Sequence, residues 1–244
     1  MKDNFSGHAS DYATYRPTYP QELIKQLADL APAHDLAWDC ATGNGQVAVM
    51  LSEYFAEVVA TDISEKQLQN AVQQPNITYK VEQAEQSSLT DNSVDLVVVA
   101  QAVHWFDFEP FYSEVQRVLR PKGIVALIGY GLIKSTPALN EVIEQLYNNL
   151  LGKYWDPERR YIDAAYGTIP FPFRELDIPQ FAIHYTWTIE DMLGYLNTWS
   201  AAKHFEKEHQ QNPVNLIEPK LRAAWGEQER VPVAFDIASR VGKV

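Results

Sequence analysis

The chain has 244 residues, a formal net charge of −12 and 46% hydrophobic residues. A chain of this size can bury roughly three-quarters of its unfolded surface in one core, so we expect one globular domain. The acidic balance argues against a nucleic-acid partner, because affinity for a phosphate backbone depends on Lys and Arg. Cys40 is the only cysteine, which excludes an intramolecular disulfide and a zinc site built on several thiolates.

The chain shows no pattern of a secretory or membrane protein. Its first twenty residues lack the apolar centre of a secretory signal, and no later run approaches the roughly 18 apolar residues of a membrane span. We therefore expect a cytoplasmic protein that binds no membrane. The sequence does not indicate an oligomeric state.

Up to residue 131, helix and strand patterns alternate. Helices are predicted over 20–31, 46–55, 65–72 and 106–123, and strands over 35–40, 57–62, 76–83, 93–100 and 124–131. Ser64, followed three residues later by Gln67, has the pattern of a capping box. The unbroken apolar run over 93–100 is typical of a strand buried on both faces. This alternation predicts an α/β fold with a doubly wound, mostly parallel sheet.

The alternation ends after Gly131. Helices are predicted over 136–155, 189–205 and 213–225, strands over 181–188 and 231–241, and an irregular segment rich in Pro and aromatic residues over 156–179. We find no repeat or linker, so we expect a single domain over 1–244. Its parts would be an amino-terminal cover and helix over 1–32, a ligand-binding core over 33–130, and an elaboration over 131–244 that covers the site and adds an antiparallel terminal strand.

A corner of small residues joins the first predicted strand to its helix. Because Gly43 and Gly45 lack a Cβ, the backbone can turn tightly there and approach a ligand, at the edge of the sheet where open α/β proteins bind ligands. Asp62 ends the second strand 23 residues after Asp39, close to the spacing at which an acid binds ribose hydroxyls. The corner could also be a tight turn without a ligand, and Asp62 an acid that stabilises a helix N-terminus.

Two kinds of nucleoside cofactor fit this pattern. A nicotinamide dinucleotide would require the pattern G-x-G-x-x-G, which here has Ala48 at its third small position. A single adenosine-bearing cofactor fits better, because the segment Ala41-Thr42-Gly43-Asn44-Gly45 resembles a G-x-G-x-G turn whose first glycine is replaced.

Four segments, in this order and spacing, resemble the class I S-adenosylmethionine-dependent methyltransferases. They read WDCATGNGQVA, VVATDIS, VEQAEQSSLTDNSVDLVVVAQAVHWF and EVQRVLRPKGIVAL, and the resemblance spans roughly residues 35 to 130. The flanking segments YATYRPTYP, QAVHWFD and LNTWSAA further resemble a small-molecule subgroup that includes trans-aconitate methyltransferase-like proteins. The chain departs from the family pattern at Ala41, where a glycine is usual, and at Gln83, where an Asp is frequent.

The resemblance implies which residues contact S-adenosylmethionine. These are Asp39, Ala41, Thr42, Gly43 and Gly45 for the methionine portion, Asp62 for the ribose, Ile63, Ala84 and Glu85 for the adenine, and Gln101 and Ala102 for the methionine amino group. Aromatic residues that could surround a sulfonium by cation–π attraction are Tyr12, Tyr15, Tyr19, Trp105 and Trp199. We assign Tyr12 to the cofactor, and Tyr15, Trp105 and Trp199 to the substrate.

Methyl transfer is a direct displacement, so the protein mainly aligns the acceptor with the methyl–sulfur bond. Arg16 could bind a carboxylate of the cofactor or of the substrate, or form a structural ion pair. His104 is the candidate catalytic base for a hydroxyl or amine acceptor, or else a partly buried residue packed beside Trp105. A carboxylate acceptor would need no base.

We therefore expect methyl transfer from S-adenosylmethionine to the oxygen of a small molecule. The alternatives are a non-catalytic protein that binds this cofactor and an NAD-dependent oxidoreductase. Methylation of nucleic-acid bases is disfavoured, because residues 100–104 do not match the Asp/Asn-Pro-Pro-aromatic loop of such enzymes. The histidines lack the spacing of a zinc site, so we expect no metal.

Overall fold

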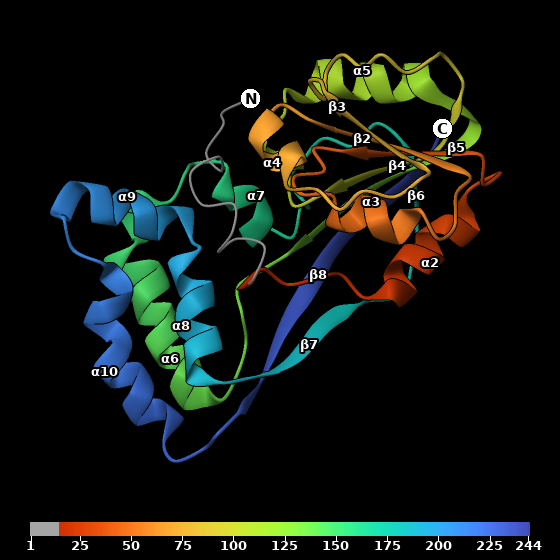
Figure 1. Cartoon of the computed structure of the whole chain (residues 1–244). Coiled ribbons are helices and arrows are strands. Elements are labelled where there is room, and N and C mark those ends of the chain that lie inside the picture. Colours follow the sequence, from red (N-terminus) through yellow and green to blue (C-terminus); the bar gives the residue numbers. More distant parts are fainter. Residues whose placement is uncertain (1–14) are drawn as a thin grey trace.

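The computed structural model describes residues 15–244, which form an eight-stranded sheet with helices on both faces (Figure 1). The strands are β1 (Leu36–Cys40), β2 (Glu57–Asp62), β3 (Ile77–Val81), β4 (Val94–Ala100), β5 (Leu119–Tyr130), β6 (Arg174–Leu176), β7 (Ala182–Trp187) and β8 (Val231–Lys243). Their order is β3-β2-β1-β4-β5-β8-β6, and β7 also pairs with β8. The first five strands pair in parallel, whereas β8 is antiparallel to its three partners. The predicted fold class is confirmed.

The helices follow the predicted alternation through the first half of the chain. They are α2 (Gln21–Leu30), α3 (Gln46–Leu51), α4 (Glu65–Gln69), α5 (Phe108–Val118), α6 (Pro137–Glu144), α7 (Arg159–Asp163), α8 (Ile189–Asn197), α9 (Ser200–His209) and α10 (Pro213–Trp225). Three shorter turns complete the set: η1 (Val103–Trp105), the π-helical η2 (Gln145–Leu150) and η3 (Gly152–Tyr154). In α4, the Ser64 hydroxyl accepts a hydrogen bond from the Gln67 amide, as the capping-box pattern predicts.

Side chains of β4 alternate between two hydrophobic clusters, one on each face of the sheet. Leu96 and Val98 belong to the cluster that buries α2 and α3, whereas Val97 and Val99 belong to the cluster that buries Phe111 of α5. Because both faces are covered, an unbroken apolar run is the pattern that such a strand requires. The apolar stripe of α2 is buried on the first face for the same reason.

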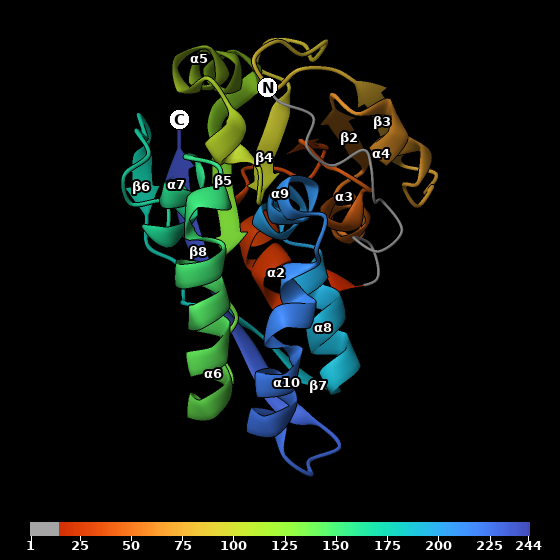
Figure 2. The same cartoon turned by 90° about the vertical axis from the view of Figure 1, so that its left-hand side faces the viewer.

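The long strand β8 connects the sheet to a helical lobe made of α6, α8, α9 and α10. Its second half, from Ile237 to Lys243, pairs with β5, whereas its first half, from Val231 to Asp236, pairs with β7. Figure 2 shows the four helices of this lobe in front of the sheet, on the side of the molecule to which β7 and β8 extend. Helix α10 contacts α6, α8 and α9, and the buried residues of the lobe belong to the same hydrophobic cluster as those of α2 and α3.

The predictions were least accurate after Gly131. The helix predicted over 136–155 is divided into α6, η2 and η3, and the one over 189–205 is divided into α8 and α9. The second break lies at Trp199, whose backbone is extended, with ψ at 132°. The irregular segment over 156–179 contains α7 and β6, which the sequence did not predict because a helix of five residues and a strand of three are too short to show a period.

Candidate functional site

The turn between β1 and α3 contains three residues in the left-handed region of backbone conformation. Ala41, Gly43 and Gly45 have φ values of 58°, 58° and 83°. A Cβ on Gly45 would lie 2.3 Å from the Tyr79 hydroxyl, whereas a Cβ on Gly43 would meet no atom within 4 Å. Ala41 therefore keeps the left-handed conformation of the glycine that it replaces in the motif, at a cost of about 1–2 kcal/mol.

Asp62, at the end of β2, is hydrogen-bonded to this turn. Its Oδ2 accepts a hydrogen bond from the Gly43 amide at 2.9 Å, and its Oδ1 accepts one from the Ser64 amide at 2.8 Å. Each carboxylate oxygen can accept more than one hydrogen bond, so both can still bind hydroxyl groups of a ligand. The two interpretations of Asp62 are thus compatible: it orders the loops and it faces the pocket.

Asp39 lies at the base of the turn and is fully buried. Its Oδ2 accepts a hydrogen bond from the Thr42 hydroxyl at 2.5 Å, whereas its Oδ1 has no hydrogen-bond partner among residues 15–244. Burial raises the pKa of Asp39 to about 7, against the opposing effect of the Thr42 hydroxyl. Near neutral pH, this side chain is therefore poised between its acid and its carboxylate form.

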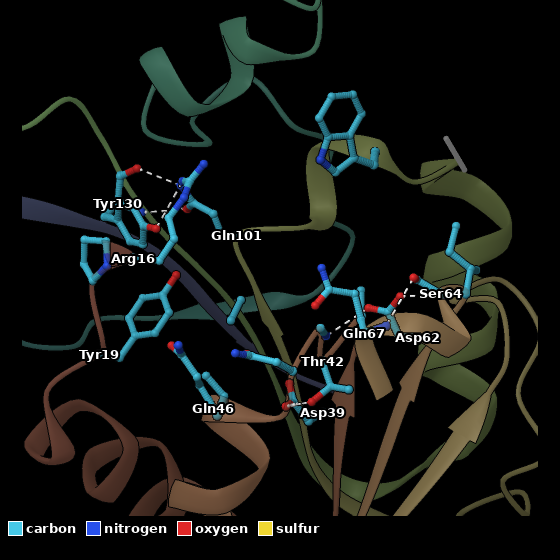
Figure 3. A pocket seen from close by; sticks show the side chains of 18 residues that line it. Arg16, Tyr19, Asp39, Thr42, Gln46, Asp62, Ser64, Gln67, Gln101 and Tyr130 are labelled. Carbon is cyan, nitrogen blue, oxygen red and sulfur yellow. Dashed lines mark hydrogen bonds between the residues drawn. The ribbon is translucent and has the colours of Figure 1, made fainter. Parts of the chain in front are cut away.

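These loops surround a first pocket at the carboxyl ends of β1, β2 and β4, beside the point where the strand order reverses. In Figure 3, Arg16, Tyr19, Gln101 and Tyr130 lie on one side of the space, Asp62, Ser64 and Gln67 on the other, and Asp39, Thr42 and Gln46 at its base. The predicted site residues that line it are Arg16, Asp39, Ala41, Thr42, Gly43, Asp62, Ile63, Gln101 and Trp105. Gln46, Ser64, Gln67 and Tyr130 also line it, although the sequence did not predict them as site residues.

The wall opposite Asp62 is held by hydrogen bonds between distant segments. Gln101 Nε2 donates to the Tyr130 carbonyl at 3.1 Å, and the Tyr130 amide donates to Gln101 Oε1 at 2.9 Å. Arg16 donates to the Tyr130 hydroxyl at 3.3 Å and to the Thr198 carbonyl at 3.2 Å. Tyr130 could have been predicted from one signal, because it is the last residue of the fifth strand, at the edge where ligands bind.

A second pocket adjoins the first and shares Arg16, Gln101 and Trp105 with it. It is lined by these three residues and by His104, Trp155, Asp156, Arg159, Ile162, Trp199 and Ser200. Arg159 Nε donates to the Tyr147 hydroxyl at 2.9 Å and to Asp163 Oδ1 at 3.3 Å. Its terminal nitrogens, Nη1 and Nη2, make no hydrogen bond to the part of the chain from Tyr15 onward. The second pocket therefore presents two guanidinium groups and three indole rings.

His104 lines the second pocket but is a poor base. Only 5% of its surface is exposed, and its Nδ1 has no hydrogen-bond partner within the described residues. Burial, assisted by the charge of Arg159, lowers its pKa to about 3. The imidazole is therefore neutral at pH 7 and binds a proton weakly, which favours a role in packing and hydrogen bonding over proton abstraction.

Five predicted site residues line neither pocket. Ala84 is buried, and Glu85 Oε1 accepts a hydrogen bond from the amide of Asp107 at 3.2 Å. Ala102 precedes η1, Gly45 begins α3 below the turn, and Tyr15 lies against Gly194 of α8. Their predicted contacts with a ligand stay predictions. Tyr12 lies outside the described residues.

Two further properties concern the same residues, 15–244. None of their helices combines the length and the apolar composition needed to cross a bilayer. No group of three or more His, Cys, Asp or Glu side chains among them is arranged to hold a metal ion.

Comparison with known proteins gives consistent matches. Residues 38–127 match the family model described as a methyltransferase domain. A protein of Dictyostelium discoideum named as a methyltransferase is 34% identical over 243 residues, which cover 96% of this chain and 92% of that protein. The solved structure of a protein from Anaeromyxobacter dehalogenans, described as a type II methyltransferase, is 41% identical with a TM-score of 0.88, over 94% of this chain and 98% of that one. A Saccharomyces cerevisiae protein described as an S-adenosylmethionine-dependent methyltransferase is 27% identical over 68% of this chain and 61% of its own length.

Proposed function

The chain belongs to the S-adenosylmethionine-dependent methyltransferases, and from this membership we propose that it transfers the methyl group to an oxygen atom of a small acceptor that carries a carboxylate. Membership in an enzyme family argues against the two alternatives, a binding protein without catalysis and a nicotinamide-dependent oxidoreductase.

The residues of the first pocket fit S-adenosylmethionine. Asp62 offers carboxylate oxygens to ribose hydroxyls, and Asp39 lies at the base of the pocket, beneath the turn that would face the methionine portion. The left-handed turn over 41–45 brings main-chain atoms to the pocket wall. When bound, the cofactor supplies an electrophilic methyl group on a sulfonium, and the protein has to exclude water and orient the acceptor.

The second pocket is the observation that supports a carboxylate acceptor. Arg16 and Arg159 line this pocket, which adjoins the cofactor pocket. A guanidinium recognises a carboxylate through paired N–H donors. A carboxylate oxygen can attack the methyl group without losing a proton, so it needs no base. The low pKa of His104 therefore supports a carboxylate over a hydroxyl as the reacting group.

Two further features support a small organic acid. Trp105, Trp155 and Trp199 form apolar walls that suit a carbon skeleton rather than a free inorganic anion. The finer resemblance of the flanking segments to trans-aconitate methyltransferase-like proteins supports the same class, since their name denotes a carboxylate substrate. We propose no nucleic-acid partner, in keeping with the net charge of −12.

The proposal is tested with S-adenosylmethionine labelled on its methyl group and a panel of small carboxylic acids. We expect the label in a methyl ester, which mild alkali releases as methanol, whereas a methyl ether would resist alkali. Arg159→Leu should raise KM for the acid by about tenfold or more, since it removes a charge-assisted hydrogen bond. Label only in alkali-stable products, or binding of the cofactor without transfer to any acid, would reject the proposal.

A further inference from the structure

The guanidinium of Arg159 is held along one edge and open along the other. Its Nε donates to the Tyr147 hydroxyl at 2.9 Å and to Asp163 Oδ1 at 3.3 Å, whereas Nη1 and Nη2 have no hydrogen-bond partner among residues 15–244. Neither of these two nitrogens is enclosed by protein, and Arg159 lines the second pocket. A carboxylate that binds there would therefore accept from Nη1 and Nη2 together, because Nε is already engaged.

Aromatic rings fix the plane of this guanidinium. Its Cζ lies 5.4 Å from the ring centroid of Tyr147 and 5.0 Å from that of Trp155. The two ring centroids are 4.7 Å apart, and the rings are inclined at 38°. A long side chain such as arginine loses rotamer freedom when it binds a ligand, and a guanidinium that is already held in place loses less. The rings and the contacts of Nε thus preorganise the open edge of Arg159.

Tyr147 contacts three residues of the second pocket, although it does not line that pocket itself. Besides the contacts of its ring and hydroxyl with Arg159, its carbonyl accepts a hydrogen bond from Trp155 Nε1 at 3.0 Å. Its ring also meets the Trp199 ring edge to face, with centroids 5.8 Å apart and an angle of 88°. One residue outside the pocket therefore helps to place two of its aromatic walls and one of its cations.

The local structure of Tyr147 suits this task. The residue lies in η2, the π-helical turn that continues α6, where the Leu151 amide donates to the Leu146 carbonyl at 2.9 Å. Single π-helical turns are rare and are frequent at functional sites. The Tyr147 hydroxyl donates to Asp163 Oδ1 at 2.7 Å while it accepts from Arg159. Burial raises the pKa of Tyr147, so the hydroxyl keeps the proton that this donation requires.

We infer that Tyr147 is a positioning residue for the acceptor: its hydroxyl and ring hold Arg159 so that Nη1 and Nη2 are presented side by side to the carboxylate. This inference rests on the proposed function and adds to it a residue that acts on the acceptor through Arg159. Asp163 completes the arrangement, because it accepts from both the Tyr147 hydroxyl and Arg159 Nε. Tyr147 takes no part in the displacement itself, so its loss should affect binding of the acid rather than transfer of the methyl group.

The test measures binding of small acids by calorimetry to the protein saturated with S-adenosylhomocysteine. The probes are succinate, citrate, benzoate and 3-phenylpropionate, together with any acid that becomes methylated in the labelling assay. Tyr147→Phe keeps the ring and removes only the hydroxyl. We expect this variant to bind the tightest of these acids about fivefold more weakly, the usual effect of losing the preorganisation of one long side chain.

Two readouts distinguish positioning from a general loss of structure. Affinity of Tyr147→Phe for S-adenosylhomocysteine should stay within about twofold, because Tyr147 does not line the first pocket. For an acid that is methylated, the variant should raise KM and leave kcat within about twofold, since the contact with the carboxylate is made before and during transfer alike. If Tyr147 acts through Arg159, adding Tyr147→Phe to Arg159→Leu should cause no further loss of affinity for the acid.

Tyr161→Phe is the matched control. The Tyr161 hydroxyl accepts a hydrogen bond from Arg160 Nη2 at 3.0 Å, and the Arg160 Cζ lies 4.8 Å from the centroid of the Tyr161 ring. The pair thus resembles Tyr147 and Arg159, but neither of its members lines the first or the second pocket. This control variant should bind the acid as the unaltered protein does.

The outcomes separate this inference from the proposed function. An unchanged affinity for the acid in Tyr147→Phe, an equal loss in Tyr161→Phe, or an additive loss in the double variant overturns the inference, while methylation of a carboxylate still stands. A protein that binds S-adenosylhomocysteine but neither binds nor methylates any of the acids overturns both.

Discussion

Asp39 and Asp62 face the same pocket from the ends of neighbouring strands, and their different surroundings give them different tasks. Asp62 is partly exposed and accepts two main-chain hydrogen bonds, whereas Asp39 is fully buried with one oxygen unpaired among residues 15–244. Two residues of one type, at the ends of neighbouring strands, thus provide a hydrogen-bonded acceptor at one side of the pocket and a titratable group at its base. Burial causes this difference.

Replacing Asp62 should strongly weaken binding of the cofactor. Asp62→Ala removes the acceptor for ribose hydroxyls and also frees the Gly43 amide, so we expect affinity for S-adenosylhomocysteine to fall about 100-fold, equivalent to about 3 kcal/mol of lost charged hydrogen bonds. Calorimetric titration measures this change, with Asp62→Asn as the control that keeps one acceptor. An affinity within threefold of the unaltered protein would show that Asp62 does not bind the sugar.

Asp39→Asn should change how stability depends on pH. The pKa of Asp39 is about 7 in the folded state and its ordinary value is 3.8, so between these pH values the folded state holds a proton that the unfolded chain has released. The contribution of Asp39 to the free energy of unfolding is therefore fully present below pH 3.8 and is lost as the pH rises through 7. Asn does not titrate, so the variant should match the unaltered protein near pH 4 and exceed it at pH 8.

Thermal or urea unfolding of both proteins at pH 4, 6 and 8 measures that difference. The gain at pH 8 should be a few kcal/mol, because a tenfold change in a proton-binding constant corresponds to about 1.4 kcal/mol. His104 contributes with the opposite sign, because its lowered pKa costs stability as the pH falls below 6.5. The comparison between variants at one pH removes this common contribution. A constant difference at all three pH values would contradict the raised pKa of Asp39.

At the scale of elements, the β1–α3 turn depends on two glycines for different reasons. Gly43 is required only for its left-handed backbone. At Gly45 the backbone is also left-handed, and in addition a Cβ would clash with the Tyr79 ring. Tyr79 lies on β3, and its hydroxyl donates to the Val72 carbonyl, so the ring is held between two elements. The β1–α3 turn is therefore packed against a side chain of β3. The conformation of this turn thus depends on the packing of another strand.

The two glycines should respond differently to the same change. Gly43→Ala should cost about 1 kcal/mol of folding free energy, the price of a left-handed alanine, as at Ala41. Gly45→Ala should cost several times more, since the new Cβ would meet the Tyr79 hydroxyl at 2.3 Å. Urea unfolding of both variants measures the difference. Adding Tyr79→Phe to Gly45→Ala should recover part of the lost free energy of unfolding. If it recovers none, a clash with the Tyr79 hydroxyl is not the cause of the loss.

At the scale of the whole molecule, the sheet order and the path of β8 assemble the site from distant segments. The reversal between β1 and β4 creates the first pocket, and the lobe that β8 supports adds Trp199 and Ser200 to the second. Arg16 connects the sheet and the lobe, because it donates hydrogen bonds to the Tyr130 hydroxyl of β5 and to the Thr198 carbonyl at the end of α8. Because β8 pairs with both β5 and β7, we propose that sheet and lobe unfold together as one domain.

Calorimetric unfolding tests this single domain. We expect one transition, and we expect S-adenosylhomocysteine at 100 times its Kd to add about 2.7 kcal/mol, which raises Tm by roughly 5–10 °C in a chain of this size. Asp62→Ala at the same ligand concentration should lose most of this shift. Two separate transitions, of which only one moves with the ligand, would mean that the lobe is an independent domain.

Much of the fold could be predicted because its elements are long enough to show their period. The apolar run of β4, the stripe of α2 and the capping residue Ser64 each show a local physical preference that the structure keeps. The turn over 41–45 and Asp62 could also be predicted from local sequence, because the glycines and Asp62 lie at the ends of predicted strands. The breaks at η2 and at Trp199, and the three-residue β6, are set by tertiary packing and leave no period.

The sequence by itself determined the order of elements, the parallel sheet, the turn at 41–45 and the family, because each depends on residues that are neighbours in the chain. Only the tertiary structure decided which residues share a pocket. It joined Arg16, His104 and Arg159 from separate segments, and it buried His104 and Asp39 so that their pKa values moved in opposite directions. Burial and long-range contacts arise only when the chain closes on itself, so no local pattern in the sequence carries them.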